Sequence, residues 1–88
     1  MELKDTIEMM TSEDYKERFK AEYHQTKIRY EKLMAFNSKI EAAKRSKGAV
    51  EEPKHDCPYE LLKQQQSVMG NYLRLLHVRA VIEGISLD

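Results

Sequence analysis

Residues 19 to 40 read FKAEYHQTKIRYEKLMAFNSKI and carry apolar or half-apolar side chains at heptad-like spacing. A second row follows in residues 61 to 82, LLKQQQSVMGNYLRLLHVRAVI, after Pro53 and Pro58. Side chains that recur in this way form one face of an α-helix, and proline marks a break between helices. The sequence therefore predicts an all-α fold, an antiparallel helical hairpin. The first row is Phe19, Tyr23, Thr26, Tyr30, Leu33 and Ile40, and the second is Leu61, Val68, Tyr72, Leu75 and Ile82.

One short and one long helix are predicted before the prolines. Leu3, Ile7 and Met10 lie at i, i+4 and i+7, so a short amphipathic helix is expected within residues 1–11. Residues 12–44 form the first long helix. The serine at its start is a candidate N-cap, and the two carboxylates that follow suit the positive end of the helix dipole.

The second long helix follows a polar connection. Residues 45–57 have no apolar period and are expected to form the turn of the hairpin. The helix of residues 58–84 begins with Pro58, whose missing N–H costs nothing in a first turn. It ends at Gly84, which can adopt the left-handed conformation of a C-cap, with the next residue folding back on the last turn. Together these elements predict a single domain over residues 1–88.

Composition excludes several classes of protein. The 88 residues hold 15 Lys+Arg and 15 Asp+Glu, so the absence of net charge argues against binding to a nucleic acid polymer. No run of 18 apolar residues is present, and no membrane partner is expected. The single cysteine cannot form an internal disulfide, which suits a reducing cytoplasm.

A chain of this length with one apolar face per helix has few side chains with which to build a core. Small chains often complete their core by association. Closed symmetry is the usual form of such association. We therefore expect the hairpin to pack into an even-numbered helical homo-oligomer, from a dimer to a hexamer.

Catalytic chemistry is poorly supported by the sequence. His24, His55 and His77 lie at no i, i+3 or i+4 spacing to one another, so they do not indicate a metal site. The three glycines form neither a P-loop nor a dinucleotide fingerprint. We expect a protein that is not an enzyme and has no catalytic residue, no metal and no cofactor.

Two groups of polar residues are open to alternative interpretations. Tyr15 lies in the first turn of a long helix beside several cations, where an anion is favoured, although a basic run is usually only a solvated face. Arg79 falls beside the apolar row of the second helix. It can pair with Glu17 or Glu22 across the hairpin, or it can face an anion.

The residues also resemble a known family. Residues 14–84 are similar to the helical-hairpin module of phage and prophage proteins that sequester cyclic nucleotide immune signals, the anti-CBASS and anti-Thoeris sponges. The residues that carry this resemblance are Tyr15-Lys16-Glu17-Arg18-Phe19, Glu22, Lys32-Leu33 and Phe36, then Leu61-Leu62, Gln65, Met69, Tyr72, Leu76 and Arg79.

The resemblance implies a phage-encoded sponge that binds a cyclic di- or trinucleotide, or a cyclic ADP-ribose-type signal, without cleaving it. Such a ligand needs an aromatic face for each base and a cation for each phosphate, from one protomer or from two. The candidate ligand-binding residues are Tyr15, Arg18, Tyr23 and Lys27 of the first long helix, with Arg74 and Arg79 of the second.

Two other classes of function remain open. An oligomeric scaffold needs only the apolar rows and no small ligand. An inhibitor directed at a host or phage protein would use exposed apolar residues near the termini, for which Met9, Met10, Ile85 and Leu87 are candidates. Direct binding of DNA ranks last, because it needs an excess of basic residues on one face.

Overall fold

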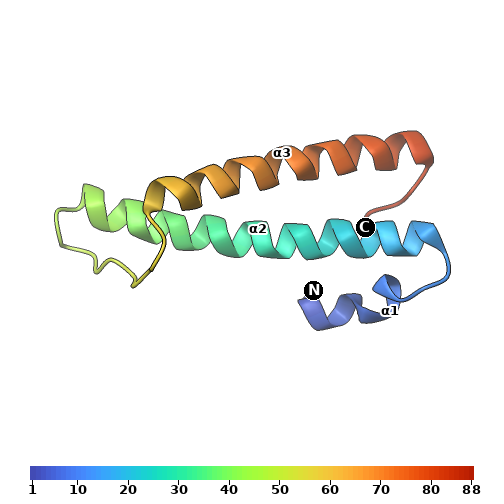
Figure 1. Ribbon diagram of the computed structural model, residues 1–88, viewed down its shortest axis with the longest axis horizontal. Helices are drawn as coiled ribbons and strands as arrows, with labels where there is room; N and C mark the ends of the chain where they lie inside the picture. Colours follow the sequence, from blue (N-terminus) through green and yellow to red (C-terminus); the bar gives the residue numbers. More distant parts are fainter.

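The computed structural model describes all 88 residues and contains only helices, turns and loops. A 3-10 turn, η1 (Leu3–Thr6), leads into α1 (Ile7–Met10), which is followed by α2 (Tyr15–Arg45) and α3 (Tyr59–Glu83). The two long helices run antiparallel and pack together along an axis of 50 Å (Figure 1). The predicted all-α hairpin is confirmed.

Helix α2 begins at Tyr15, after a different N-cap from the predicted one. The Asp14 carboxylate accepts a hydrogen bond of 2.9 Å from the backbone N–H of Lys16. Ser12 instead accepts from the backbone N–H of Asp14, at 3.1 Å. The prediction of Ser12 as the cap is wrong because both residue types can cap a helix and Asp14 lies nearer the first turn.

The predicted C-cap of the second helix is confirmed. Gly84 adopts the left-handed conformation, with φ 69°, and the N–H of Ile85 donates to the Ala80 carbonyl at 2.8 Å. Ile85 is thereby folded into a cluster with Phe19, Leu76 and Ala80. It is buried rather than exposed, so it cannot act as a docking residue at the terminus.

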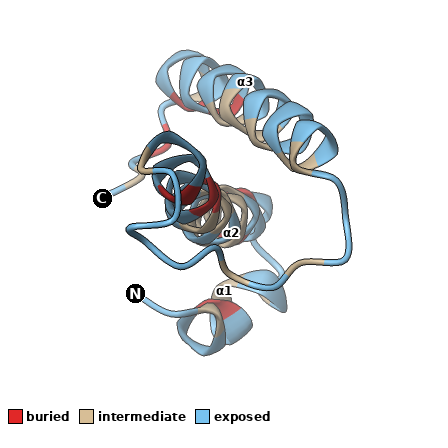
Figure 2. Ribbon diagram, turned by 90° about the vertical axis from the view of Figure 1, so that its left-hand side faces the viewer, coloured by how far each residue is buried: buried red, intermediate tan, exposed pale blue.

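The aliphatic part of the apolar row predicted for the second helix is turned away from α2, whereas its Tyr72 donates to Glu22 of α2. The four aliphatic side chains of this row are between 52% and 77% exposed, and much of α3 is exposed in Figure 2. The row packed towards α2 lies one position further along the chain. Helix α3 carries apolar side chains in two adjacent rows, and periodicity alone does not say which one the partner helix covers. The buried or half-buried row is Leu62, Gln66, Met69, Leu73, Leu76 and Ala80.

The N-terminal segment docks on the opposite side of α2 from α3 (Figures 1 and 2). Its anchor is Thr6, which is fully buried. The Thr6 hydroxyl donates to the Leu3 carbonyl at 2.7 Å and accepts from Gln25 Nε2 at 2.8 Å. Because this buried hydroxyl both donates and accepts a hydrogen bond, it fixes the position of the segment on α2.

Two histidines have pKa values shifted in opposite directions. His55 lies in the connecting loop, with Nδ1 2.6 Å from the Cys57 carbonyl and Nε2 3.0 Å from Glu52. These contacts, the backbone carbonyl first and the carboxylate second, raise the pKa of His55 above its ordinary 6.5. His24 lies on α2, where burial first, and then Lys27 and the N-terminal ammonium, lower its pKa.

We expect Ile40→Ala to reduce the free energy of unfolding by about 2–5 kcal/mol, because Ile40 is fully buried and the substitution leaves a cavity. Met34→Ala on the same helix is the control, since Met34 is 38% exposed, and we expect a change of roughly 0.5 kcal/mol or less. Chemical denaturation measures both values. Equal losses in the two variants would contradict the assigned core.

We expect a proton NMR titration to give a pKa above 6.5 for His55 and below 6.5 for His24. His55 then stabilises the fold fully below its unfolded pKa, and this contribution is lost as pH rises through its raised folded pKa. His24 acts in the opposite sense, with a contribution present above its unfolded pKa and lost as pH falls through its lowered folded pKa. Equal pKa values for the two imidazole rings would contradict the different surroundings described for them.

Candidate functional site

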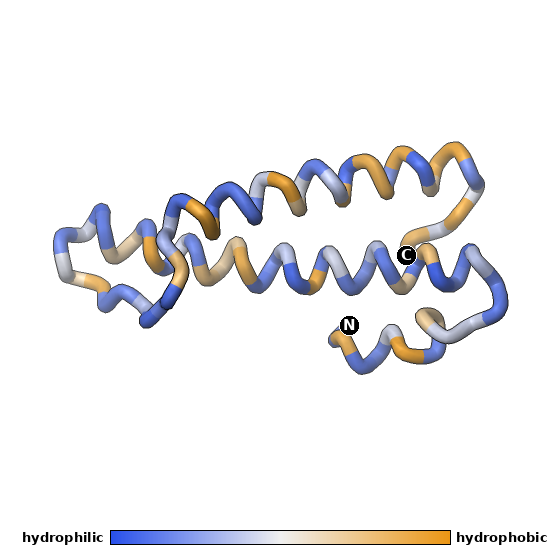
Figure 3. The backbone as a smooth tube through the Cα atoms, in the orientation of Figure 1, coloured by the Kyte–Doolittle hydropathy of each residue, from blue (hydrophilic) through white to orange (hydrophobic).

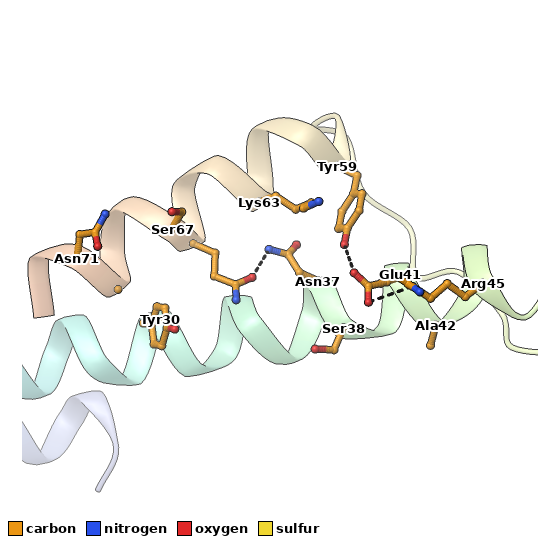
Figure 4. A pocket seen from close by; sticks show the side chains of 12 residues that line it. Tyr30, Asn37, Ser38, Glu41, Ala42, Arg45, Tyr59, Lys63, Ser67 and Asn71 are labelled. Atoms are coloured by element: carbon orange, nitrogen blue, oxygen red, sulfur yellow. Dashed lines mark hydrogen bonds and ion pairs between the residues drawn. The ribbon is translucent and has the colours of Figure 1, made fainter. Parts of the chain in front are cut away.

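A polar cavity lies between α2 and α3 in the half of the hairpin nearest the connecting loop (Figure 4). Its volume is about 630 Å³, which is within the usual range for small-molecule sites. We call it the polar cavity. Helix α2 and helix α3 each contribute one wall, and the lining residues are Tyr30, Asn37, Ser38, Glu41, Ala42, Arg45, Tyr59, Lys63, Gln66, Ser67, Gly70 and Asn71.

Asn37 is the most deeply buried polar residue of this cavity, with only 3% of its surface exposed. Its amide nitrogen donates to the Leu62 carbonyl at 3.1 Å and to Gln66 Oε1 at 2.9 Å. A backbone carbonyl can only accept, so these contacts fix the orientation of the amide. The Asn37 Oδ1 atom is left buried with no hydrogen-bond partner. Leaving such an acceptor without a partner costs about 1–3 kcal/mol.

Tyr59 forms the rim at the loop end of the cavity. Its hydroxyl donates to Glu41 at 3.3 Å, and Glu41 also pairs with Arg45 at 3.3 Å (Figure 4). Partial burial first, and then the Glu41 carboxylate, raise the pKa of the Tyr59 phenol above 10.0, so the group is neutral at neutral pH. The ammonium groups of Lys44 and Lys63 lie 5.7 and 5.3 Å from the ring centroid.

The charges of the polar cavity favour an anion. Arg45 and Lys63 are its cations, and Glu41 is its carboxylate. Glu41 pairs with Arg45, whereas Lys63 forms no ion pair. A lysine held over a tyrosine ring and not neutralised by a carboxylate is suited to bind a phosphate as a point charge.

A second, shallower depression of about 350 Å³ continues along the same two helices. We call it the apolar hollow. Tyr30 and Gly70 line both depressions, so they mark the boundary between the two. A Cβ atom on Gly70 would lie 3.2 Å from the Tyr30 ring, so glycine lets the ring approach the α3 backbone. The lining residues are Tyr23, Tyr30, Gly70, Leu73, Arg74, His77 and Val78.

The structure brings together two of the six predicted ligand-binding residues. Tyr23 of α2 and Arg74 of α3 line the apolar hollow. Tyr15, Arg18, Lys27 and Arg79 line neither depression.

These four residues have other surroundings. Tyr15 and Lys27 are exposed on α2, and Arg18 donates to the Ser12 carbonyl at 2.7 Å. Arg79 lies over the Phe19 ring, 4.8 Å from its centroid, and pairs with Glu83 at 2.9 Å.

Arg79 therefore does not pair with Glu17 or Glu22, the partners expected across the hairpin. Glu17 pairs with Lys20, and Glu22 accepts from the Tyr72 hydroxyl. Glu83 lies one helical turn from Arg79 on the same helix, and such i,i+4 pairs form without any contribution from the tertiary fold.

Sequence reasoning missed the residues that form the polar cavity. Asn37 was the available signal, because an amide in an otherwise apolar row must find hydrogen-bond partners when it is buried. Its partner Gln66 belongs to a run of three glutamines, and periodicity does not single it out. Tyr59 and Lys63 lie four residues apart on α3 and are neighbours on any helix, so their contact could have been expected from the predicted helix of residues 58–84.

No group of three or more His, Cys, Asp or Glu side chains is placed to hold a metal ion. None of the helices combines the length and the apolar character that crossing a membrane demands. A family model described as Sequestin matches residues 13–82, a range that takes in α2, the connecting loop and nearly all of α3. Neither the curated proteins nor the solved structures give a match to the chain.

Proposed function

The chain belongs to the Sequestin family, and we propose that it is a phage-encoded sponge for a cyclic nucleotide immune signal of the CBASS or Thoeris type. The family name denotes sequestration, and the matched residues include both depressions between α2 and α3. In this proposal the protein binds the intact signal in the host cytoplasm and does not cleave it. The ligand is a cyclic di- or trinucleotide or a cyclic ADP-ribose-type signal.

The unpartnered amide oxygen of Asn37 is the observation that carries this proposal. It is an acceptor held in a fixed orientation at a polar cavity, and the N–H groups of a nucleobase are donors of the matching kind. Lys63, which has no carboxylate partner, is available for a phosphate on the same ligand. The neutral phenol of Tyr59 completes the rim with an aromatic face and a hydroxyl.

The apolar hollow suits a second part of the same ligand. The rings of Tyr23 and Tyr30 offer faces on which a base can stack, and Arg74 can bind a phosphate in a bidentate manner. A cyclic signal with two nucleoside units could then occupy both depressions across the Tyr30–Gly70 boundary. This arrangement binds the signal without any chemical reaction, and binding alone is sufficient for sequestration.

Four of the residues predicted from the sequence have a different place in the proposal, namely Tyr15, Arg18, Lys27 and Arg79. Because they line neither depression, they would contact a ligand only at its outer edge or from a neighbouring protomer. Even-numbered homo-oligomers place equivalent residues of two copies on either side of an axis. We retain these four residues as candidates for that position.

A scaffold or a protein-directed inhibitor is the second candidate function. The observation that favours it is the row of exposed aliphatic side chains on α3. Exposed apolar rows are commonly covered by another protein surface. Such a protein would need no small ligand.

The test is to incubate the protein with a panel of cyclic di- and trinucleotides and cyclic ADP-ribose isomers. After washing, heat releases whatever is bound, and mass spectrometry identifies it. We expect one signal to be recovered intact at stoichiometric yield. Recovery of a cleaved product would indicate an enzyme, and an empty panel would favour the scaffold or inhibitor.

We expect Lys63→Glu to weaken retention of that signal by roughly tenfold or more, because it removes a charge-assisted contact and places a carboxylate beside the phosphate. Lys39→Glu is the matched control, since Lys39 is exposed on α2 and lines neither depression. Equilibrium dialysis measures both variants. Unchanged binding in Lys63→Glu, with loss in Arg18→Glu or Lys27→Glu, would move the site to the N-terminal end of α2.

A further inference from the structure

A row of four residues on α3 runs along both the polar cavity and the apolar hollow. Its members follow one another at spacings of four, three and four, so they lie on one side of the helix. The row begins in a hydrophilic part of α3 and ends in a more hydrophobic part (Figure 3). We call it the groove row. It consists of Lys63, Ser67, Gly70 and Arg74.

The two ends of the groove row are cations without a carboxylate partner. Lys63 lines the polar cavity and Arg74 lines the apolar hollow, and neither forms an ion pair. They lie at positions i and i+11, roughly 16 Å apart along the helix axis. The Lys63 ammonium points towards Tyr59 at the start of α3 and therefore away from Arg74 (Figure 4). The two positive charges are thus well separated.

The groove row has no side chain at its middle. Gly70 lies near the centre of α3, and its φ is not positive, unlike that of Gly48 and Gly84. Glycine is less favourable than alanine inside a helix, so backbone conformation does not account for it. A Cβ atom at this position would lie 3.2 Å from Tyr30 Cε1 and 3.4 Å from the Tyr30 hydroxyl. The close approach of the Tyr30 ring is what this position requires.

We propose that Gly70 determines the specificity of the binding site by keeping Tyr30 against the α3 backbone and the two depressions connected. This inference rests on the proposed function. Tyr30 lines both depressions, so a larger side chain at position 70 would displace its ring and obstruct the passage between them. With glycine there, one ligand can reach Lys63 and Arg74 at the same time.

The separation of the two cations selects one class among the proposed ligands. In a cyclic di- or trinucleotide, a nucleoside lies between each phosphate and the next. In a cyclic ADP-ribose-type signal, the two phosphates are joined directly as a diphosphate. Two cations held far apart match separated phosphates, whereas a diphosphate would place both of its charges near one cation. The ligand chemistry assigned to the site is that of a cyclic oligonucleotide.

Isothermal titration calorimetry of the full chain tests this assignment with cyclic di-AMP, cyclic di-GMP, cyclic tri-AMP and cyclic ADP-ribose. We expect at least one of the three oligonucleotides to bind roughly tenfold or more tightly than cyclic ADP-ribose. Tighter binding of cyclic ADP-ribose would overturn the inference and leave the proposed sponge function intact. Binding of none of the four would overturn both.

Substitutions of Gly70 test its role with the oligonucleotide that binds best. Gly70→Leu fills the boundary and should weaken binding roughly tenfold or more. Gln64→Leu is the control, since Gln64 is exposed on α3 and lines neither depression. Gly70→Ala should keep or raise the midpoint of thermal unfolding, because alanine favours the helix. Unchanged binding by a folded Gly70→Leu chain, or a lower unfolding midpoint in Gly70→Ala, would overturn the specificity role.

A double-mutant cycle tests the separation of the anions without any change at the helix contact. Lys63→Gln and Arg74→Gln should each weaken binding of the same oligonucleotide roughly tenfold. Together they should weaken it roughly a hundredfold, because cations that hold different phosphates act independently. A double variant no weaker than either single variant would show that both cations hold one anion and would overturn the inference. Wild-type affinity in both single variants would also overturn it.

Discussion

The shortage of apolar side chains between α2 and α3 is the constraint on which the other features depend. Nine of the 88 residues are buried, and one compact cluster around Phe19 and Leu76 closes the hairpin at the end where the termini lie. Towards the connecting loop, Ile40 and Ala43 are also buried, but the contact there includes the hydrogen-bonded polar pair of Asn37 and Gln66. Two helices in contact along one side cannot bury their remaining surfaces, so a polar cavity stays open between them and an apolar row stays exposed outside.

Asn37 links stability and recognition in this arrangement. Its two donated hydrogen bonds hold α3 at one register on α2, since a shift along the helix would leave a buried amide without acceptors. The same contacts use the nitrogen and leave the oxygen unpaired. The residue that aligns the helices thus carries an unpaired acceptor at the polar cavity, and this acceptor makes the cavity the strongest candidate site in the chain.

The sequence predicted the helical hairpin, the Gly84 cap and the resemblance to sequestering proteins, and these predictions are confirmed. It did not predict which side of α3 faces α2, because two neighbouring apolar rows have the same period. It also did not predict the polar cavity, because Asn37 of α2 meets Tyr59 and Lys63 of α3 only through the register of the two helices. The spacing of apolar residues along a helix does not say which residues of two different helices lie side by side.

The proposed function requires a nucleotide signal to bind between α2 and α3. The most direct measurement is an NMR titration of the labelled protein with the intact signal, followed through the Asn37 side-chain amide and the backbone amide of Gly70. We expect saturable shifts at both groups, since Asn37 lines the polar cavity and Gly70 lies at its boundary with the apolar hollow. Shifts confined to the first turns of α2, with Asn37 and Gly70 unchanged, would contradict the claim.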